Sequence, residues 1–307
     1  MKVNTSAKPS ALYFNELAPI RDDDVVLAGH LYSLEFEDDP FSRLMICRDG
    51  KRWNHLGDID SIVSSVVAYL NDAGRAVVLG VGRTGETLTI DSAGVRIGTI
   101  PMDPGFLFQA RRVGDAVYAC GSQRQVWRLR SDQWTRVDAG LAVPRQDEDN
   151  PILYCLGGVS ERCLYAGGRM GELYFSNGTG WTAVDSPTSQ DIERIEVVSE
   201  DEVYFCGKGG TLYRGRDGEW EMIGDPDSTE TYWGLAWFKG RIYVSSVSHL
   251  FVHDGSTLQP VAPPPAPAFA FHRLAASSRY LWATGGDGTV ARWDGSAWQR
   301  FLCPDNA

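Results

Sequence analysis

Residues 203–220 read VYFCGKGGTLYRGRDGEW, and the same unit returns twice more with its length unchanged. Residues 164–181 read LYAGGRMGELYFSNGTGW, and residues 281–298 read LWATGGDGTVARWDGSAW. Each copy holds an apolar strand, a glycine turn, a second apolar strand, a polar turn with glycine, and a tryptophan in a further strand. Repetition of one short-strand unit predicts a repeat architecture.

Weaker copies extend the repeat over almost the whole chain. They lie at residues 25–53, 76–95, 117–134 and 242–258, which makes seven units. The tryptophan, or the residue that replaces it, stands at positions 53, 95, 134, 181, 220, 258 and 298, at intervals that average about 41 residues. Such a period with several short strands is typical of a propeller blade, and the 3.6-residue pattern of helical repeats is absent.

We therefore predict an all-β fold, a seven-bladed β-propeller with four-stranded antiparallel blades of about 40 residues. Residues 11–303 are expected to form this single domain, and residues 1–10 an N-terminal arm. In the unit around Trp220, strands A to D are expected at 192–198, 202–206, 211–214 and 219–223. Glycines between B and C supply the positive φ of a tight turn. The tryptophan on strand D is expected to fill the widening gap between blades.

The repeat resembles that of bacterial Asp-box (BNR-type) propellers, the superfamily that includes sialidases and photosystem assembly factors, and more distantly that of kelch repeats. The resemblance rests on the glycine turn, Leu212-Tyr213, Asp217-Gly218 and Trp220, and it covers roughly residues 12–301. Residues 216–220 and 293–298 lack the usual serine of the Asp-box and its fixed spacing. The resemblance implies a fold and not an activity, because unrelated functions share these motifs.

Charge and hydropathy limit the classes of partner. The 307 residues include 29 Lys and Arg against 40 Asp and Glu, a net charge of −11. We therefore expect a protein partner with a basic surface, and no nucleic acid. The longest apolar stretches are about half of the roughly 20 residues that span a bilayer, so no membrane partner is expected. Residues 1–10 lack the apolar core of a secretory signal, which makes the cytoplasm the expected location.

Motifs for catalysis or nucleotide binding fail on their context. Residues 80–87, GVGRTGET, match G-x-G-x-x-G, but a β segment follows where a phosphate site needs a helix. A hairpin within a blade is the better interpretation. Residues 157–161 are interpreted as a turn between strands A and B and not as a nucleophile elbow. We expect no catalytic residue and no cofactor.

Metal sites find equally little support. His249 and His253 would lie about 13 Å apart along one strand, too far for a single ion. The acidic runs 22–24 and 147–149 lack the spacing of a calcium loop. The cysteines at 47, 120, 155, 163, 206 and 303 form no C-x-x-C pair. We interpret them as buried thiols and expect no metal.

Strand alternation places the D–A connectors and the B–C turns on one side of the ring, here called the D–A/B–C face. Its connectors are long and acidic, whereas the turns of the opposite A–B/C–D face are short, and long loops usually carry binding. An aromatic patch rimmed by charge is typical of a protein-binding hot spot. The candidate partner-binding residues are Tyr232, Trp233, Arg194 and His272 at the channel mouth, Asp147, Glu148, Asp149, Asp225, Asp227 and Glu230 in the connectors, and Arg83, Arg124, Arg169 and Lys208 in the B–C turns.

These features favour a non-enzymatic propeller that binds another protein. A specific hypothesis is an immunity protein, or antitoxin, that neutralises a basic secreted bacterial toxin. Two alternatives stay open: a glycan-active hydrolase or lyase with a site at the channel mouth, and an assembly or scaffold factor. Clustered Arg, Glu and Tyr around a deep pocket would favour the enzyme. A broad face with exposed aromatic residues would favour binding.

Overall fold

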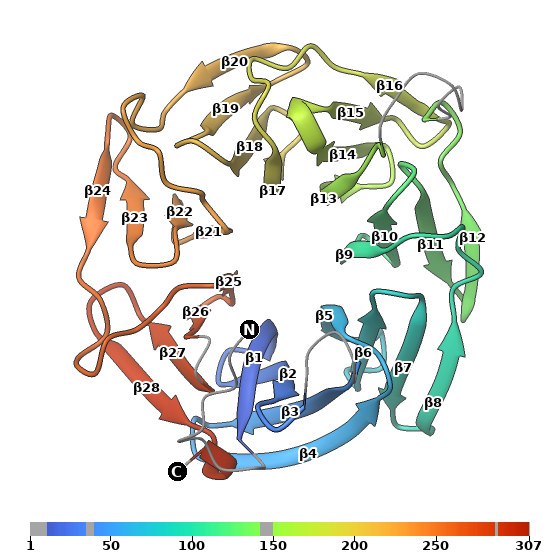
Figure 1. Ribbon diagram of the computed structural model, residues 1–307, viewed down its shortest axis with the longest axis vertical. Helices are drawn as coiled ribbons and strands as arrows, with labels where there is room; N and C mark the ends of the chain where they lie inside the picture. The colour runs from blue at the N-terminus through green and yellow to red at the C-terminus, as the bar shows by residue number, and fades with distance from the viewer. Residues whose placement is uncertain (1–10, 35–39, 142–149, 286–287, 307) are drawn as a thin grey trace.

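The computed structural model describes residues 11–34, 40–141, 150–285 and 288–306. They form seven four-stranded antiparallel sheets, which surround a central axis as blades (Figure 1). Strands that follow one another in the chain are neighbours in every blade, and strand A lies nearest the axis. The predicted seven-bladed β-propeller is confirmed.

The blades are numbered 1 to 7 in chain order, and their strands share the same order from the axis outward. Strand A comprises β1 (Leu12–Arg21), β5 (Val63–Leu70), β9 (Leu107–Val113), β13 (Leu153–Ser160), β17 (Ile192–Ser199), β21 (Gly234–Phe238) and β25 (Arg273–Ala276). Strand B comprises β2 (Asp24–Leu31), β6 (Ala76–Gly82), β10 (Ala116–Gly121), β14 (Cys163–Gly168), β18 (Glu202–Gly207), β22 (Arg241–Ser245) and β26 (Leu281–Thr284).

The two outer strands complete each blade. Strand C comprises β3 (Ser42–Arg48), β7 (Glu86–Asp91), β11 (Val126–Arg130), β15 (Leu173–Ser176), β19 (Leu212–Arg216), β23 (Leu250–His253) and β27 (Thr289–Trp293). Strand D comprises β4 (Arg52–Ile59), β8 (Gly94–Thr99), β12 (Gln133–Arg136), β16 (Trp181–Ala183), β20 (Glu219–Met222), β24 (Leu258–Val261) and β28 (Trp298–Leu302). Two 3-10 turns, η1 (Arg169–Gly171) and η2 (Pro304–Asn306), are the helical elements of the described residues.

The B strands are apolar on both faces, and this pattern requires a cover on each side of a blade. In β2, Val25 and Leu27 pack into a cluster shared with blade 7, whereas Val26 and Ala28 pack into a cluster shared with blade 2. Successive residues of a strand point to opposite faces, so a continuous apolar run is buried only between two neighbouring sheets. Seven such clusters lie at the seven blade interfaces.

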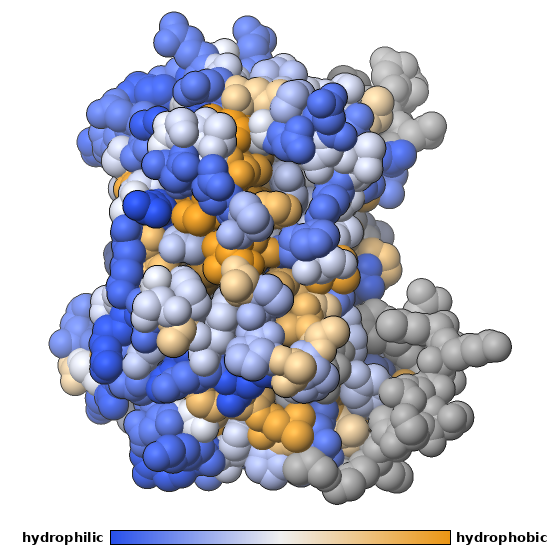
Figure 2. Space-filling model, turned by 90° about the vertical axis from the view of Figure 1, so that its left-hand side faces the viewer, coloured by the Kyte–Doolittle hydropathy of each residue, from blue (hydrophilic) through white to orange (hydrophobic). Residues whose placement is uncertain are grey.

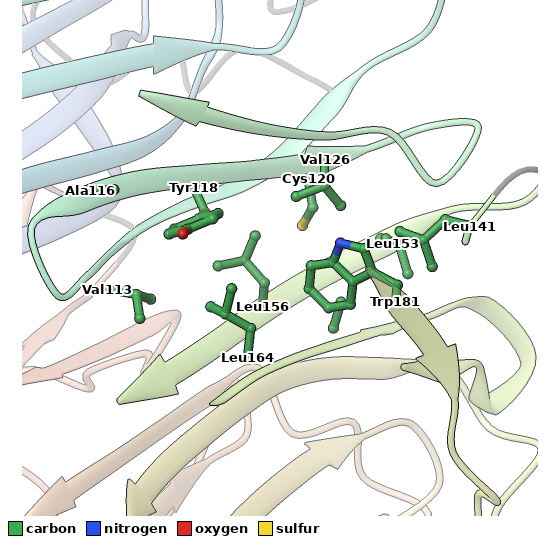
Figure 3. Packing of buried hydrophobic residues seen from close by; sticks show 11 residues of the cluster. Val113, Ala116, Tyr118, Cys120, Val126, Leu141, Leu153, Leu156, Leu164 and Trp181 are labelled. Atoms are coloured by element: carbon green, nitrogen blue, oxygen red, sulfur yellow. The ribbon is translucent and has the colours of Figure 1, made fainter. Parts of the chain in front are cut away.

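Trp181 shows how strand D fills the outer part of an interface. Its ring is 5% exposed and packs with Tyr118 and Cys120 of blade 3 and with Leu153 of its own blade (Figure 3). Its indole N–H donates to the carbonyl of Val137, at 2.8 Å, in the connector that leaves blade 3. The predicted role of this tryptophan as a wedge between blades is confirmed.

Two other D-strand tryptophans repeat this hydrogen bond. The indole of Trp220 donates to the Asp185 carbonyl at 3.0 Å, and that of Trp298 donates to the Ala262 carbonyl at 2.7 Å. Each acceptor lies in the D–A connector that enters the tryptophan's own blade. The tryptophan therefore ties that connector to the outer strand of the blade that follows it.

The rim of the ring presents a different surface. Figure 2 views it from the side of β24 and shows a hydrophobic band along the rim with hydrophilic residues beside it. Within β24 the end residues Leu258 and Val261 are half-buried, and the two residues between them are exposed. In β24, the outermost strand of blade 6, the apolar residues are thus the less exposed ones.

Blade 1 and blade 7 close the ring by packing, because each contains four consecutive strands of its own. The Leu12 backbone N–H donates to Asn306 Oδ1 at 2.9 Å, and Asn306 Nδ2 donates to the Leu12 carbonyl at 2.8 Å. On the opposite face Asp23 forms ion pairs with Arg279 and Arg292. Blades 1 and 7, which hold the first and last described strands, thus lie side by side at this seam (Figure 1).

Two local expectations are settled by the strand bounds. Residues 80–87 form a hairpin between β6 and β7, as predicted. The interpretation of residues 157–161 as a turn was wrong, because Gly157 and Gly158 lie within β13. A Cβ atom on Gly157 would lie 3.0 Å from the carbonyl oxygen of Ile195, so glycine here permits a close approach of β17.

The six cysteines are buried free thiols, as predicted.

The C–D turns of blades 4, 6 and 7 share one side-chain cap. Asp294 Oδ1 accepts from the backbone N–H groups of Ser296 (2.7 Å) and Ala297 (2.8 Å). These bonds and the Ser296 hydroxyl favour the carboxylate and lower the pKa of Asp294 to about 2. In blade 4 the amide of Asn177 takes this place and accepts from the N–H and hydroxyl of Thr179.

Replacing Trp181 with Phe tests the indole hydrogen bond. Because the change leaves the Val137 carbonyl without its donor, Trp181→Phe should lower the free energy of unfolding by about 1 kcal/mol more than Trp134→Phe. Trp134 is a control for the hydrogen bond alone, since its indole N–H has no hydrogen-bond partner among the described residues, and its ring is half-buried where that of Trp181 is buried. Urea unfolding measures both, and equal losses would contradict the role given to the N–H group.

The low pKa of Asp294 predicts a pH-dependent contribution to stability. A carboxyl with a pKa lowered from about 3.9 stabilises the fold above that value and loses this effect as the pH falls toward about 2. The difference in unfolding free energy between wild type and Asp294→Ala should therefore be largest above about pH 4 and shrink toward pH 2. Asn177→Ala removes the same kind of cap without a titrating group, and its penalty should not change with pH. Parallel pH profiles for the two variants would refute the assignment.

Candidate protein-binding face

Backbone hydrogen bonds join the B–C turns to the D–A connectors. The Arg169 N–H donates to the Ile152 carbonyl at 2.9 Å, and the Lys208 N–H donates to the Asp191 carbonyl at 3.1 Å. In both cases a B–C turn meets the segment just before strand A of the same blade. The two kinds of loop therefore lie on one side of the ring, as the alternation of strands predicted.

Three B–C turns adopt one left-handed geometry, but only one of them is made of glycine. In blade 5 the central residues are Gly209 (φ 61°) and Gly210 (φ 71°), as expected for a tight hairpin turn. In blade 4 Met170 (φ 56°) takes the place of Gly209. In blade 3 Gln123 (φ 59°) and Arg124 (φ 52°) take both places. A left-handed backbone costs a residue with a Cβ about 1–2 kcal/mol, so these side chains are present at a cost to stability.

Apolar side chains are exposed on the D–A/B–C face. Met170 is 70% exposed, and Phe106 and Val247 are each 43% exposed. Phe106 lies just before β9, and the Arg83 guanidinium stands 4.6 Å from its ring centre in a cation–π contact. Large exposed apolar residues with charged neighbours form the kind of surface that a protein partner buries.

The predicted basic residues of the B–C turns fall into two groups. Arg124 is buried, and its Nε donates to Glu172 Oε2 at 2.9 Å, so it joins the turns of blades 3 and 4. Lys208 is exposed and pairs with Asp191 at 2.6 Å. Burial would raise the pKa of Asp191, but Lys208 and the Met170 N–H outweigh it and lower that pKa. Arg83 and Arg169 are half-buried.

The aromatic residues predicted at the channel mouth are more enclosed than expected. Tyr232 is 2% exposed and packs between blades 5 and 6, so its ring is a core residue and not a surface residue. Trp233, next in the chain, is half-buried. His272 is half-buried, with its ring edge-on to Tyr13 at 5.8 Å. Of these aromatic residues, Tyr232 therefore belongs to a blade interface, and His272 of blade 7 contacts Tyr13 of blade 1.

The acidic candidates separate in the same way. Asp225 and Asp227 are exposed, and neither forms an ion pair with a described residue. Glu230 lies 3.1 Å from His249 Nδ1 in the B–C turn of blade 6. Asp147, Glu148 and Asp149 lie outside the described residues. Among the described candidates, the carboxylates without an ion pair are thus those of the connector between blades 5 and 6.

Arg194 is set apart from the other candidates because it lines the central channel. It lies near the start of β17 and is half-buried. Its Nη1 donates to the Glu193 carbonyl at 2.6 Å. Arg194 was predicted at the mouth of the channel, and in the structure its side chain lines the channel.

No group of three or more His, Cys, Asp or Glu within the described ranges is arranged to hold a metal ion. The placement of His249 and His253 on one strand was wrong: His249 lies in the turn before β23, and His253 is buried at the end of β23. In the part of the chain that the structure describes, no helix has the length and apolar character to cross a membrane.

Met170 and Val247 were missed as candidates, and for Met170 a signal was present. The aligned repeats place Met170 where blade 5 has Gly209. A residue other than glycine at a position that the repeat reserves for positive φ is a departure that the sequence alone displays. Val247 carries no comparable signal, because a short turn gives no indication of how far its side chain is exposed.

The Arg124–Glu172 pair should be structural. Arg124→Ala leaves the largely buried Glu172 carboxylate unpaired, so it should lower the free energy of unfolding by about 2 kcal/mol. Arg83→Ala removes only the partly exposed cation–π contact and should cost less than about 1 kcal/mol. Chemical denaturation of both variants measures the difference. A loss for Arg83→Ala as large as that for Arg124→Ala would overturn the assignment.

Comparison with known proteins gives one similar sequence and many similar folds. The chain is 35% identical over 191 residues to the immune protein Tsi7 of Pseudomonas aeruginosa. The aligned part is 62% of this chain and 62% of that relative, so less than two thirds of the relative's length is matched. No protein-family model matches the chain.

Solved structures of other propellers superpose on almost the entire chain. Virginiamycin B lyase of Staphylococcus aureus gives a TM-score of 0.70 at 11% identity and covers 99% of this chain and 98% of its own. YCF48 of Cyanidioschyzon merolae gives 0.66 at 13% identity and covers 98% of both chains. At such identities the structures share a fold with this chain and nothing more. The chain is thus a seven-bladed propeller that is similar in sequence, over three-fifths of its length, to an immune protein.

Proposed function

We propose that the chain is an immunity protein that binds a bacterial toxin and neutralises it. The observation that carries this proposal is the 35% identity to an immune protein over 191 residues. A relation at this level extends well beyond the propeller repeat, because propellers that share only the fold are 11–14% identical to the chain. Immunity by tight binding needs a surface and no catalytic group.

The D–A/B–C face is the surface that we assign to the toxin. Met170, Phe106 and Val247 supply exposed apolar contacts, and Met170 is held there by a strained backbone. A strained backbone that presents an exposed apolar side chain on this face supports a role for Met170 in binding. Asp225 and Asp227 leave negative charge free on the same face, which supports a toxin with a basic surface.

Binding is favoured over catalysis by the state of the channel. The channel carries Arg and Glu, which meets part of the criterion for an enzyme. Both glutamates are paired with arginine: Glu16 with Arg273, and Glu196 with Arg111, each at 2.7 Å. The lining residues of the described chain include no Tyr or His. Carboxylates held in this way support a non-enzymatic protein.

Two further expectations belong to this proposal. We place its action in the cytoplasm, where six buried free thiols suit a reducing compartment. We also infer that the C–D turns at Asp254 and Asp294 are degenerate Asp-boxes. Their support is the carboxylate that caps the turn from the position of the Asp-Gly pair.

Met170→Gly tests the face without disturbing the fold. Glycine relieves the left-handed backbone, so the free energy of unfolding should stay level or rise by about 1 kcal/mol. Loss of the exposed side chain should weaken toxin binding at least about tenfold. Calorimetric titration with a candidate toxin taken from the neighbouring genes measures the affinity, and survival of cells that express this candidate measures protection.

Ser131→Gly is the matched control. Ser131 (φ 51°) is an exposed left-handed residue in a C–D turn, so the change relieves similar strain on the opposite face. It should leave toxin affinity unchanged. Equal affinity for wild type and Met170→Gly would exclude this face, and failure of the wild-type chain to bind or protect against the toxin would contradict the proposed function itself.

A further inference from the structure

The central channel contains an unusual concentration of positive charge. A cavity of about 430 Å³ lies on the axis and is lined by strand A of every blade except blade 4. Its lining carries four arginines and two glutamates, in a chain with a net charge of −11. The charge of the channel thus opposes that of the molecule as a whole.

Three of the four arginines are engaged. Arg273 Nε pairs with Glu16 at 2.7 Å, and Arg111 Nη2 of blade 3 pairs with Glu196 of blade 5 at 2.7 Å. Arg112 donates to the carbonyls of Gly114 and Leu70, at the other end of the channel. Their charges or their hydrogen bonds are therefore satisfied within the protein.

Arg194 is the exception. Within the described residues its guanidinium donates only to the Glu193 carbonyl, and no carboxylate lies within ion-pair distance. Burial and the nearby Arg273 guanidinium lower the pKa of Arg194, although the Glu16 and Glu193 carboxylates act in the opposite direction. A guanidinium that leaves water retains most of its donors for an anion, and its planar fork matches the two oxygens of a carboxylate.

We propose that the channel is a carboxylate-binding pocket in which Arg194 is the primary ligand and Arg273 supplies a second positive charge. Arg194 precedes Glu196 along β17, so it lies toward the mouth on the D–A/B–C face. A carboxylate can therefore come from an acidic side chain or chain terminus of the bound toxin, which rests on the proposed function, or from a small free acid. Both sources present the same group to the same guanidinium.

The probe for the pocket is acetate, compared with chloride at equal ionic strength. Saturation transfer from the protein to the acetate methyl protons should be observed for the wild-type chain and lost in Arg194→Gln. Acetate should also raise the unfolding temperature of the wild-type chain about 2 °C more than that of Arg194→Gln. General salt effects act on both variants and cancel in this comparison.

Two control variants guard against indirect effects. Arg112→Gln removes a channel arginine that already has partners and should keep the acetate signal. Arg194→Lys keeps the charge and should keep part of the signal, and circular dichroism verifies that each variant is folded. Absence of the signal in the wild-type chain, or an equal signal in Arg194→Gln, would overturn the proposal.

Titration with the toxin distinguishes the two sources. A toxin carboxylate predicts that Arg194→Gln weakens toxin binding about tenfold or more and that acetate competes with the toxin. A small free acid predicts loss of the acetate signal with unchanged toxin affinity. If the wild-type chain binds acetate but no toxin, the pocket stands and the proposed function fails.

Discussion

The architecture depends on the burial of each sheet between two others. The B strands are apolar on both faces, so a blade alone would leave both faces in water, and a blade with a single neighbour would still leave one exposed. At roughly 25 cal/mol for each Å² of apolar surface, such exposure would be costly, and it is removed only when every blade has a neighbour on each side. A closed ring meets this requirement without end blades. The seam between blades 1 and 7 is therefore an ordinary interface, with the cluster around Phe14 and Trp282 in place of a shared strand.

Closure of the ring also determines which residues are not needed for packing the blades. The blade interfaces are occupied by seven apolar clusters, and the indole hydrogen bonds of Trp181, Trp220 and Trp298 hold the connectors against strand D. What remains free to vary are the loops at the two faces and the residues along the channel. The left-handed Met170 and the underpaired Arg194 both belong to these regions, and both are costly to the isolated fold. Both are therefore the residues on which the proposals for the face and for the channel rest.

Much of the fold could be predicted from the sequence, because it follows from repetition. All seven anchor positions lie within the first two residues of strand D, although Val95 and Leu258 replace the tryptophan. The periodicity averages over seven copies, so a weak copy does not harm the prediction. The wrong prediction of a turn at Gly157 and Gly158 came from a local feature that the repeat does not average. Glycine in a strand reports a close approach of neighbouring backbone, and only the packing of β13 against β17 distinguishes that use from a turn.

The candidate site was predicted in part, for a physical reason. Alternation of strands decides which loops share a face, and the structure brings the described candidates to that face or to the channel. The alternation of strands does not decide which side chains are buried. Tyr232 packs between two blades and Arg124 pairs with Glu172 of the next blade, and such contacts between blades cannot be read from one repeat. Exposure depends on three-dimensional neighbours that a repeat alignment does not contain. The channel charge was missed as a unit because its members come from strands up to 257 residues apart.

Hydrogen–deuterium exchange of the chain, free and mixed with the proposed toxin partner, tests the central claim most directly. Backbone amides in the B–C turns at residues 121–125, 168–172 and 246–249 should exchange more slowly in the complex, whereas the C–D turns at 254–257 and 294–297 should not change. Protection confined to the C–D turns, or spread along the rim, would contradict the account.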